Sequence, residues 1–390
     1  MADLSVTVDG IKFPNPFVIG SGPPGTNANV INKAFAEGWG GVIAKTISLD
    51  ASKVVNVAPR YARLRSADKK EVYGWQNIEL ISDRPFETWL DEFKKVKDKH
   101  PDGILIASIM EEFNKDAWIE ITERCQAVGV DAFELNFSCP HGLPERKMGA
   151  AMGQDPDVLE EVCGWVNGVA TIPVWAKMTP NITHIVDPAR AALRAGCEGI
   201  AAINTILAVT GVNLDTLRPE PTVEGYSVPG GYSCKAVRPI ALRMVMELAT
   251  MMYGGGSGRL IDENATYTGE YPDRSLSAIG GVETGEDAAQ FILMGASTVQ
   301  VCTGVMIHGY KLASALCDGL GAFMDKHEFA SIEDFRGHTL KYFATHAELV
   351  RRQREVKAAE KAEKAGMVTK DTAWEGDKFV EQSDKLVSND

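Results

Sequence analysis

The sequence predicts an α/β protein folded as a closed (β/α)8 TIM barrel, with long insertions after its strands and a C-terminal helical tail. Eight short apolar runs, rich in β-branched residues, alternate with longer segments of helical periodicity. Strands that alternate with helices form a parallel sheet, and eight such units close into a barrel. No G-x-G-x-x-G motif follows a strand, which disfavours the alternative of an open, doubly wound sheet.

The predicted elements follow one another in a regular order along the chain. The strands are expected at 17–20, 41–45, 104–109, 132–136, 173–178, 199–204, 276–281 and 297–303. The helices are expected around 30–38, 116–129, 155–169, 187–196, 239–252, 284–295 and 310–326. Two long connections, 46–103 and 205–275, both follow a strand and therefore belong to the face where barrels build their active sites. Within the second, the Gly-rich segment 253–274 is typical of a mobile surface loop.

The character of the sequence changes after about residue 334. A highly charged helical segment, 347–366, has few apolar positions that could pack on a core. We therefore expect a barrel over residues 1–334 and a charged helical arm over 335–390, packed on the barrel or on a second subunit.

Composition restricts the kind of partner. The chain has 390 residues and a hydrophobic content of 45%, enough for a large core. Its formal net charge of −13 disfavours nucleic acid, because an acidic surface repels phosphate backbones. No apolar run approaches the roughly 18 residues that span a bilayer, so no membrane interaction is expected. The start, MADLSVTVDG, lacks a leader pattern, which indicates a cytosolic protein or a mature form.

The seven cysteines are scattered, and none form a C-x-x-C pair. This spacing argues against zinc ribbons, iron–sulfur clusters and thioredoxin-like chemistry, so no metal site is expected. An odd number of cysteines in a chain of this size indicates free thiols in a reducing compartment. Most of them are expected to be buried and inert.

Polar residues stand where the predicted strands end, and in a barrel these ends all meet on one face. These residues are Ser21, Lys45, Thr46, Ser108, Asn136, Lys177, Asn204, Thr205, Gly280, Gly281, Cys302 and Thr303. Two lysines, two asparagines and several hydroxyls together predict a polar floor of net positive charge.

The segments after the last two strands, GGVET and CTGV, indicate a phosphorylated cofactor. Barrels often hold a phosphate there with backbone N–H groups, and glycines let the backbone approach closely. A Gly-Gly pair also occurs in ordinary turns. A strand-end lysine can likewise be merely solvated or ion-paired. A positive charge beside N1 and O2 of a flavin would stabilise the anionic reduced ring, and Lys177 fits that role best.

Cys139 follows a predicted strand in the stretch FELNFSCPHG, residues 133–142. A thiol with an ordinary pKa of roughly 8.5 is mostly protonated at neutral pH and can still release its proton, which suits a general acid. A nucleophile is an alternative, although no histidine base is evident, since His141 is typical of a plain loop residue. A buried, inert cysteine is the third interpretation.

The sequence also resembles a known family in many motifs that occur in the same order. The resemblance is to the pyrimidine-reducing branch of the dihydroorotate dehydrogenase-like flavoproteins, and it is found in NFSCPHG, AKMTPN, AAINT, GGYSCKAVRPIALR, IGGVET and VQVCTGVM. It extends over nearly the whole chain through FVIGSGPPGTN, KTISLDASKV, GWQNIELISDRP and FRGHTLKYF. The plastid members from plants and green algae are the most similar.

The resemblance implies an FMN-binding barrel that reduces the 5,6 double bond of uracil and thymine with electrons from NADPH, the first step of pyrimidine breakdown. The residues that would contact FMN are Ser21, Lys45, Thr46, Asn136, Lys177, Gly231, Gly280, Gly281, Cys302 and Thr303. The residues that would hold the pyrimidine are Asn77, Glu79, Asn136, Ser138, Asn204 and Thr205. A hydride from N5 of FMN would go to C6, and Cys139 would deliver a proton to C5. Lys177 would be the second catalytic residue.

The resemblance further implies a plastid location. A homodimer is expected from the charged arm, which has little apolar surface for its own barrel. Larger members of the family carry FAD, an NADPH site and iron–sulfur clusters in other domains, and this chain shows none of the cysteine motifs. NADPH would therefore reduce FMN directly, or a separate reductase would pass on its electrons.

Three other functions remain as alternatives. A dihydroorotate dehydrogenase would need a site for the carboxylate of orotate, and Glu79 in GWQNIELIS would repel that group. A tRNA dihydrouridine synthase would need a basic RNA-binding surface, which the acidic composition does not provide. A non-catalytic flavin-binding or assembly subunit is disfavoured by the intact run of polar strand ends.

Overall fold

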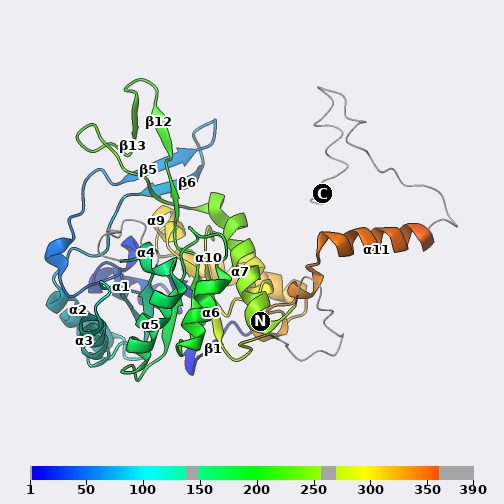
Figure 1. Ribbon diagram of the computed structural model, residues 1–390, viewed down its shortest axis with the longest axis horizontal. Coiled ribbons are helices and arrows are strands. Elements are labelled where there is room, and N and C mark those ends of the chain that lie inside the picture. Colours follow the sequence, from blue (N-terminus) through cyan, green and yellow to red (C-terminus); the bar gives the residue numbers. More distant parts are fainter. Residues whose placement is uncertain (1, 138–147, 256–268, 360–390) are drawn as a thin grey trace. The chain divides into compact units, whose positions relative to one another are not determined.

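The computed structural model describes residues 2–137, 148–255 and 269–359. The chain divides into two compact units, Met1–Phe343 and Ala344–Asp390. The first unit contains the barrel and its insertions, and the second contains one described helix (Figure 1).

Eight parallel strands close into the predicted barrel. In spatial order they are β3 (Phe17–Ile19), β4 (Gly41–Ile43), β7 (Leu105–Ile109), β8 (Ala132–Asn136), β9 (Val174–Lys177), β10 (Gly199–Ala202), β15 (Ser275–Ile279) and β16 (Thr298–Val301). The pairing of β16 with β3, with Val299 opposite Phe17 and Val301 opposite Ile19, closes the sheet. The eight predicted strands are therefore confirmed in number, order and direction.

The longer helices that follow these strands are also those predicted, with one addition. They are α1 (Ala28–Ala36), α3 (Lys115–Gln126), α5 (Pro156–Asn167), α6 (Val186–Arg194), α7 (Arg238–Tyr253), α8 (Gly285–Leu293) and α10 (Leu312–Lys326). The addition is α2 (Phe86–Lys99), which lies in the first long connection, and α4 (Ala150–Gly153) and α9 (Thr303–His308) are short. Several start at side-chain caps, such as Asn27, Asn114, Asp155 and Thr284. No described helix is long and apolar enough to cross a bilayer.

A large apolar core fills the space between the barrel strands and the helices. Fully buried aromatic residues of the helices, such as Trp89, Phe93 and Trp118, pack there with strand residues such as Phe17 and Phe133. A smaller cluster joins Val6, Val8 and Phe13 to barrel residues. These three residues belong to the hairpin of β1 (Val6–Val8) and β2 (Ile11–Phe13). Figure 1 shows β1 at the end of the barrel away from β12 and β13, so this hairpin closes the N-terminal face.

Asp9, in the turn of that hairpin, holds it to the barrel. Its Oδ2 accepts hydrogen bonds from Trp175 Nε1 and Ser275 Oγ, each at 2.5 Å. Burial raises the pKa of the Asp9 carboxyl above its ordinary value, against the lowering effect of the two hydrogen bonds. Because the folded-state pKa lies above the unfolded one, protonation favours the folded state, and this contribution is lost as the pH rises through the folded pKa.

We predict that Asp9→Asn leaves the free energy of unfolding at pH 7 unchanged or slightly higher, since the amide oxygen can still accept both bonds without a buried charge. Asp9→Ala leaves two donors without partners and lowers the free energy by about 2 kcal/mol or more, at ~1–3 kcal/mol for each unsatisfied group. Urea unfolding at pH 7 measures both variants. Equal losses in the two variants would contradict the argument.

The two long insertions meet in a second, antiparallel sheet at the other end of the barrel. Its strand order is β11 (Ile206–Ala208), β14 (Gly230–Ser233), β6 (Val72–Asn77) and β5 (Tyr61–Arg65). The hairpin of β12 (Gly211–Asn213) and β13 (Arg218–Glu220) projects at the same end (Figure 1). This sheet was not predicted from the sequence, because the β6–β14 pairing joins segments far apart in the chain. Most of the expected surface loop, residues 256–268, lies outside the described residues.

The second unit is described by α11 (His346–Ala359). Ion pairs within this helix join Arg352 to Glu348 at 2.8 Å and Arg351 to Glu355 at 2.7 Å. The chain just before it belongs to the first unit, since Phe335 and Leu340 are buried in the barrel core. The compact barrel unit thus runs on to Phe343, whereas the boundary expected from the sequence is at about residue 334.

Candidate active site

A large pocket lies between the C-terminal ends of the barrel strands and the four-stranded sheet. Residues that follow β3, β4, β10 and β16 form one part of its wall, and Tyr61, Trp75 and Tyr232 of the sheet form another. The space at this pocket, which includes open solvent at its mouth, is about 1180 Å³.

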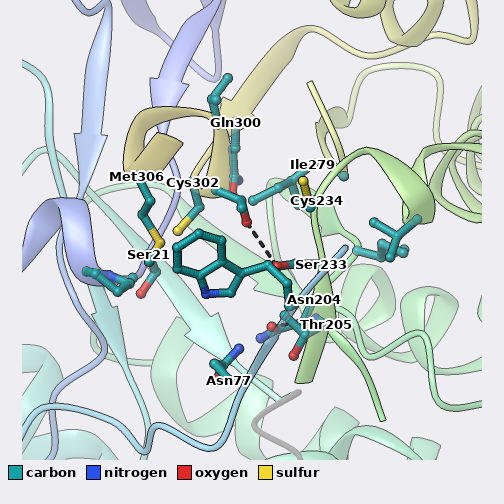
Figure 2. Close-up of a pocket in the computed structure, with 18 of the residues that line it drawn as sticks. Ser21, Asn77, Asn204, Thr205, Ser233, Cys234, Ile279, Gln300, Cys302 and Met306 are labelled. Atoms are coloured by element: carbon teal, nitrogen blue, oxygen red, sulfur yellow. Dashed lines mark hydrogen bonds between the residues drawn. The ribbon is translucent and has the colours of Figure 1, made fainter. Parts of the chain in front are cut away.

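Nearly all of the residues predicted to form a site lie together in this pocket. Its lining includes Ser21, Lys45, Thr46, Asn77, Glu79, Asn136, Lys177, Asn204, Thr205, Gly280, Gly281, Cys302 and Thr303. Gly231 stands directly behind the wall, because its carbonyl oxygen accepts a hydrogen bond from Asn77 Nδ2 at 3.1 Å. Figure 2 shows Asn77, Asn204 and Thr205 on one side and Cys302 and Met306 on the other. Ser138 and Cys139 lie outside the described residues.

A buried ionic network lies in the floor of the pocket. Lys177 Nζ lies 3.2 Å from Glu134 Oε1 and donates to Gln300 Oε1 at 2.8 Å. Gln300 Nε2 in turn donates to Glu134 Oε2 at 2.8 Å and to Ser277 Oγ at 3.0 Å. The residues Lys177, Glu134 and Gln300 are at most 4% exposed. A buried charge of this kind is tolerated only when paired and hydrogen-bonded, as it is here.

A second ion pair holds the other lysine. Lys45 Nζ lies 2.8 Å from Glu79 Oε2, and Arg60 Nε lies 3.6 Å from Glu79 Oε1. Burial and the adjacent Glu79 carboxylate raise the pKa of Tyr61 to about 12, so its hydroxyl stays neutral at physiological pH. Glu79 is therefore fixed in the pocket wall by two cations.

The prediction of a net positive floor is wrong for the described lining. Two lysines are accompanied there by three glutamates, Glu79, Glu134 and Glu283. Glu134 lies within an otherwise apolar predicted strand, but alternate residues of a barrel strand point inward, and this one meets Lys177. A lone glutamate within an apolar strand was the signal that a buried partner had to exist.

Hydroxyl and amide groups form a connected chain along the strand ends. Thr46 Oγ1 lies 2.8 Å from Ser108 Oγ and 3.1 Å from Ser21 Oγ, and it accepts a hydrogen bond from Asn136 Nδ2 at 2.9 Å. The strands β7 and β8 and the segments after β3 and β4 are thereby tied together at one point. Such a network fixes the rotamers of its members and aligns polar groups before a ligand arrives.

The loop after β10 is held by a neighbouring asparagine. Asn181 Nδ2 donates to Thr205 O at 3.2 Å, and Asn181 Oδ1 accepts from Leu207 N at 2.8 Å. Thr205 N donates to Asn204 Oδ1 at 2.7 Å, which orients the amide of Asn204. Sequence reasoning did not single out Asn181, which acts on the site through the backbone of the loop.

The Gly-Gly pair after β15 is required by the chain itself. Gly281 has a φ of +72°, and a Cβ there would lie 2.8 Å from Cys234 O and from Lys235 Cα. A Cβ at Gly280 would lie 2.5 Å from the Ala241 side chain. The glycines thus let the segment after β14 and the start of α7 pack against the strand end. This close approach explains them without any ligand.

The two described thiols of the pocket are both in their neutral form. Burial raises the pKa of Cys302 to about 11, and burial likewise raises the pKa of Cys234 to about 11. Cys234 Sγ also lies 3.6 Å from Glu283 Oε1, and a nearby carboxylate disfavours a thiolate further. Since the thiolate is the reactive form, neither residue is a ready nucleophile.

The fold and the site together indicate the class of protein. A closed (β/α)8 barrel that collects lysines, amides and hydroxyls in one deep pocket at its C-terminal face is built like a barrel enzyme that acts on a small molecule.

Comparisons with known proteins identify the family within this class. A model of the family "Dihydroorotate dehydrogenase" matches residues 3–256 and 253–324. The chain is 62% identical over 391 aligned residues, 99% of this chain and 88% of the relative, to the chloroplastic dihydropyrimidine dehydrogenase (NADP(+)) of Arabidopsis thaliana. It is 40% identical over 335 residues, 86% of this chain and 76% of the relative, to the NAD-dependent dihydropyrimidine dehydrogenase subunit PreA of Escherichia coli K12.

A solved structure agrees with the fold. The dihydroorotate dehydrogenase of Eimeria tenella in complex with ferulenol superposes with a TM-score of 0.67 at 22% identity, covering 86% of this chain and 88% of that one. The chain belongs to the dihydroorotate dehydrogenase family.

Membership in this family implies a flavin and a pyridine-nucleotide cofactor, and the residues present fit a flavin. A lysine is fixed in the pocket floor by Glu134 and Gln300, where a positive charge suits an anionic reduced flavin. No described residue accepts a hydrogen bond from the backbone N–H of Gly281, Thr303 or Gly304, so these donors are available for a phosphate.

Proposed function

We propose that this protein reduces uracil and thymine at the 5,6 double bond with electrons from NADPH, using FMN held in the pocket. The net reaction converts pyrimidine, NADPH and a proton to the 5,6-dihydropyrimidine and NADP+, the first step of pyrimidine breakdown. The observation that carries the proposal is the set of amides, Asn77, Asn136 and Asn204, that line one pocket together with Glu79 and the buried Lys177.

The strand-end residues would hold the FMN. Lys45, Thr46, Ser21 and Asn136 are tied to one another or to their neighbours by hydrogen bonds and an ion pair, so they offer a rigid polar surface. The backbone after β15 and β16, at Gly280, Gly281, Cys302 and Thr303, would hold the phosphate, as these loops often do in barrels. Gly231 would support this region from β14. When bound, FMN supplies a hydride at N5.

The chain would bind the pyrimidine through its amides. An asparagine side chain both donates and accepts, so Asn77, Asn136 and Asn204 can match the alternating C=O and N–H groups of a uracil edge. Glu79 and Thr205 also line the pocket, and the Glu79 carboxylate can accept a ring N–H. Because Asn77 Nδ2 is bound to Gly231 O and the Asn204 amide to Thr205 N, both amides are oriented before the substrate binds.

Charge and proton transfer would be divided between two residues. Lys177 would stabilise the negative charge of the reduced flavin from the floor of the pocket. Cys139 would donate a proton to C5 of the pyrimidine, with Ser138 beside it in sequence, both following the strand end at Asn136. A thiol that protonates carbon acts as a general acid.

The dihydroorotate alternative is disfavoured by the pairing of charges. Orotate carries a carboxylate that needs a cation, and the only cations in the described lining are Lys45 and Lys177. Glu79 and Glu134 already pair with them. Uracil and thymine are neutral and do not need a cation in the site. Glu79 already forms an ion pair with Lys45, a cation that orotate would need. It therefore disfavours orotate mainly through this pairing and less through direct repulsion.

The location and the assembly are part of the proposal. The Arabidopsis relative is chloroplastic, and this supports a plastid location for this protein. We further propose a homodimer in which the arm after Phe343 packs on a second subunit, because Leu349 and Val356 of α11 are 50% and 54% exposed.

Truncation after Phe343 is predicted to convert the dimer to a monomer while leaving the flavin bound. This cut spares Phe335 and Leu340, which are buried in the barrel core, whereas a cut after Asp334 would remove them and damage the fold. Light scattering coupled to size exclusion gives the mass. An unchanged dimer mass would show that the arm is not needed for dimerisation.

One anaerobic absorbance experiment tests the function. NADPH is added to the purified protein, the flavin band near roughly 450 nm is followed as the readout of cofactor redox state, and uracil is then added. Loss of the band with NADPH and its return with uracil support the full proposal. If only dithionite bleaches the band and uracil restores it, the pyrimidine chemistry stands and a separate reductase delivers the electrons. If uracil never restores the band, the substrate assignment is wrong and orotate is tried next.

A further inference from the structure

The segment over residues 60–70 is unusually basic for this protein. It contains β5 and the turn toward β6, and it carries five cations, Arg60, Arg63, Arg65, Lys69 and Lys70, against the single carboxylate of Asp68. We call residues 60–70 the basic hairpin. The protein as a whole has a net charge of −13. An anionic ligand would be repelled by most of such a surface and attracted locally by this part of it.

Strand register places one of these cations beside the pocket. Arg63 stands opposite Trp75, and Trp75 stands opposite Ser233 on the next strand. Directly paired residues of an antiparallel sheet share a face, so the three side chains form one row. Trp75 and Ser233 both line the pocket. Arg63 is the outermost member of the row, on the edge strand β5.

Two groups of this row have no hydrogen-bond or ion-pair partner among the described residues. The guanidinium of Arg63 lies 4.5 Å above the centre of the Trp75 ring, and no described carboxylate pairs with it. By contrast, nearby Arg60 and Lys235 pair with Glu79 and Glu71. The indole Nε1 of Trp75, a residue only 6% exposed, also has no hydrogen-bond partner among the described residues. A buried donor at a pocket wall is normally satisfied, which points to a ligand.

We propose that Arg63 and the basic hairpin bind the phosphates of NADPH at the mouth of this same pocket. The inference rests on the proposed function, which makes NADPH the electron donor. NADPH carries a diphosphate and a 2′-phosphate, and a guanidinium binds phosphate with paired N–H donors. Stacking on Trp75 holds the Arg63 guanidinium in place before the ligand arrives, which reduces the entropy lost on binding. The 2′-phosphate is the group that would distinguish NADPH from NADH.

Direct binding tests this site without turnover. The probe is adenosine 2′,5′-bisphosphate, titrated by calorimetry into the full-length, flavin-loaded protein, with 5′-AMP as the ligand that lacks the 2′-phosphate. We expect the bisphosphate to bind more tightly than 5′-AMP and more weakly as salt is raised. Arg63→Glu should weaken it by about tenfold or more, the scale of one charge-assisted hydrogen bond, and Arg63→Lys should restore part of the loss. Equal affinity of the wild type and Arg63→Glu would overturn the proposal.

A matched control separates this site from general charge effects. Arg218 is an exposed arginine on β13, in the other insertion, and it does not line the pocket. Arg218→Glu makes the same change in net charge and should leave bisphosphate affinity within about twofold. An equal loss of bisphosphate affinity in the Arg218 and Arg63 variants would reflect only the overall electrostatic field of the protein. It would overturn the assignment.

Kinetics separate this inference from the function on which it rests. Arg63→Glu should raise KM for NADPH while uracil reduction by the dithionite-reduced protein stays unchanged. If neither the bisphosphate nor NADPH binds the wild type, the inference fails and the basic hairpin is left as a docking surface for an acidic electron-donor protein. If the dithionite-reduced protein does not reduce uracil, the proposed function itself is wrong, whatever the bisphosphate does.

Discussion

Replacement of Cys139 by alanine lowers the turnover of uracil by about 100-fold or more, the usual scale for the loss of a general acid. The physical reason is that a hydride delivered to C6 leaves negative charge on C5 and the C4 carbonyl oxygen, and the product forms only when C5 is protonated. Alanine has no proton to give. Flavin content should stay normal, because Cys139 is not among the residues proposed to contact the flavin. Steady-state rates and the absorbance of the bound flavin measure both effects.

Two further variants make this test specific. Cys139→Ser keeps a hydroxyl of similar size that is a much weaker acid than a thiol, so it should remain strongly impaired. Cys317→Ala removes a partly exposed thiol on α10, outside the pocket, and should turn over normally. Near-normal turnover of Cys139→Ala would rule out its role as the acid. A similar loss in Cys317→Ala would point to general damage from the loss of a thiol.

Replacement of Lys177 by methionine is expected to lower the free energy of unfolding by about 3–5 kcal/mol, the cost of leaving one partner of a buried ion pair alone. Glu134, 1% exposed, would then lack its cation and keep only the hydrogen bond from Gln300. The variant should also retain FMN poorly. Chemical unfolding and flavin occupancy measure the two losses.

The double variant Lys177→Met with Glu134→Gln separates stability from redox tuning. A glutamine at 134 can still bond to Gln300 without a charge, so most of the lost stability should return. The positive charge beside the flavin stays absent, so the flavin midpoint potential should remain below that of the wild type. A double variant as unstable as the single one would contradict the ion-pair argument. A wild-type potential in the double variant would contradict the electrostatic role of Lys177.

The barrel could be predicted from sequence because each of its units is local. A strand such as 132–136 and the helix that follows it can both be identified from their hydrophobic periodicity within about thirty residues, the length of a βαβ unit. The strand ends then converge by geometry alone. This is why eleven of the thirteen predicted residues in the pocket, all but Asn77 and Glu79, lie together although they are far apart in sequence.

The parts that could not be predicted depend on pairing between distant segments. Tyr61, Trp75, Tyr232 and Ser233 reach the pocket only because β6 pairs with β14, and the bond from Asn77 to Gly231 spans 154 residues. Glu134 was missed for a related reason. Its partner Lys177 comes 43 residues later, and their contact needs two adjacent strands whose side chains both point inward.

The pairing of the first and last barrel strands determines when, during synthesis, the proposed flavin site becomes complete. Ser21 follows β3 and Cys302 follows β16, and the two strands are joined by a bond from Gly20 N to Val301 O at 3.1 Å. The proposed cofactor site is therefore divided between the two ends of the barrel sequence, and contacts of such long range form late and slowly. A nascent chain that has not yet reached Thr303 cannot offer the complete site, so loading of the flavin must follow synthesis of nearly the whole barrel.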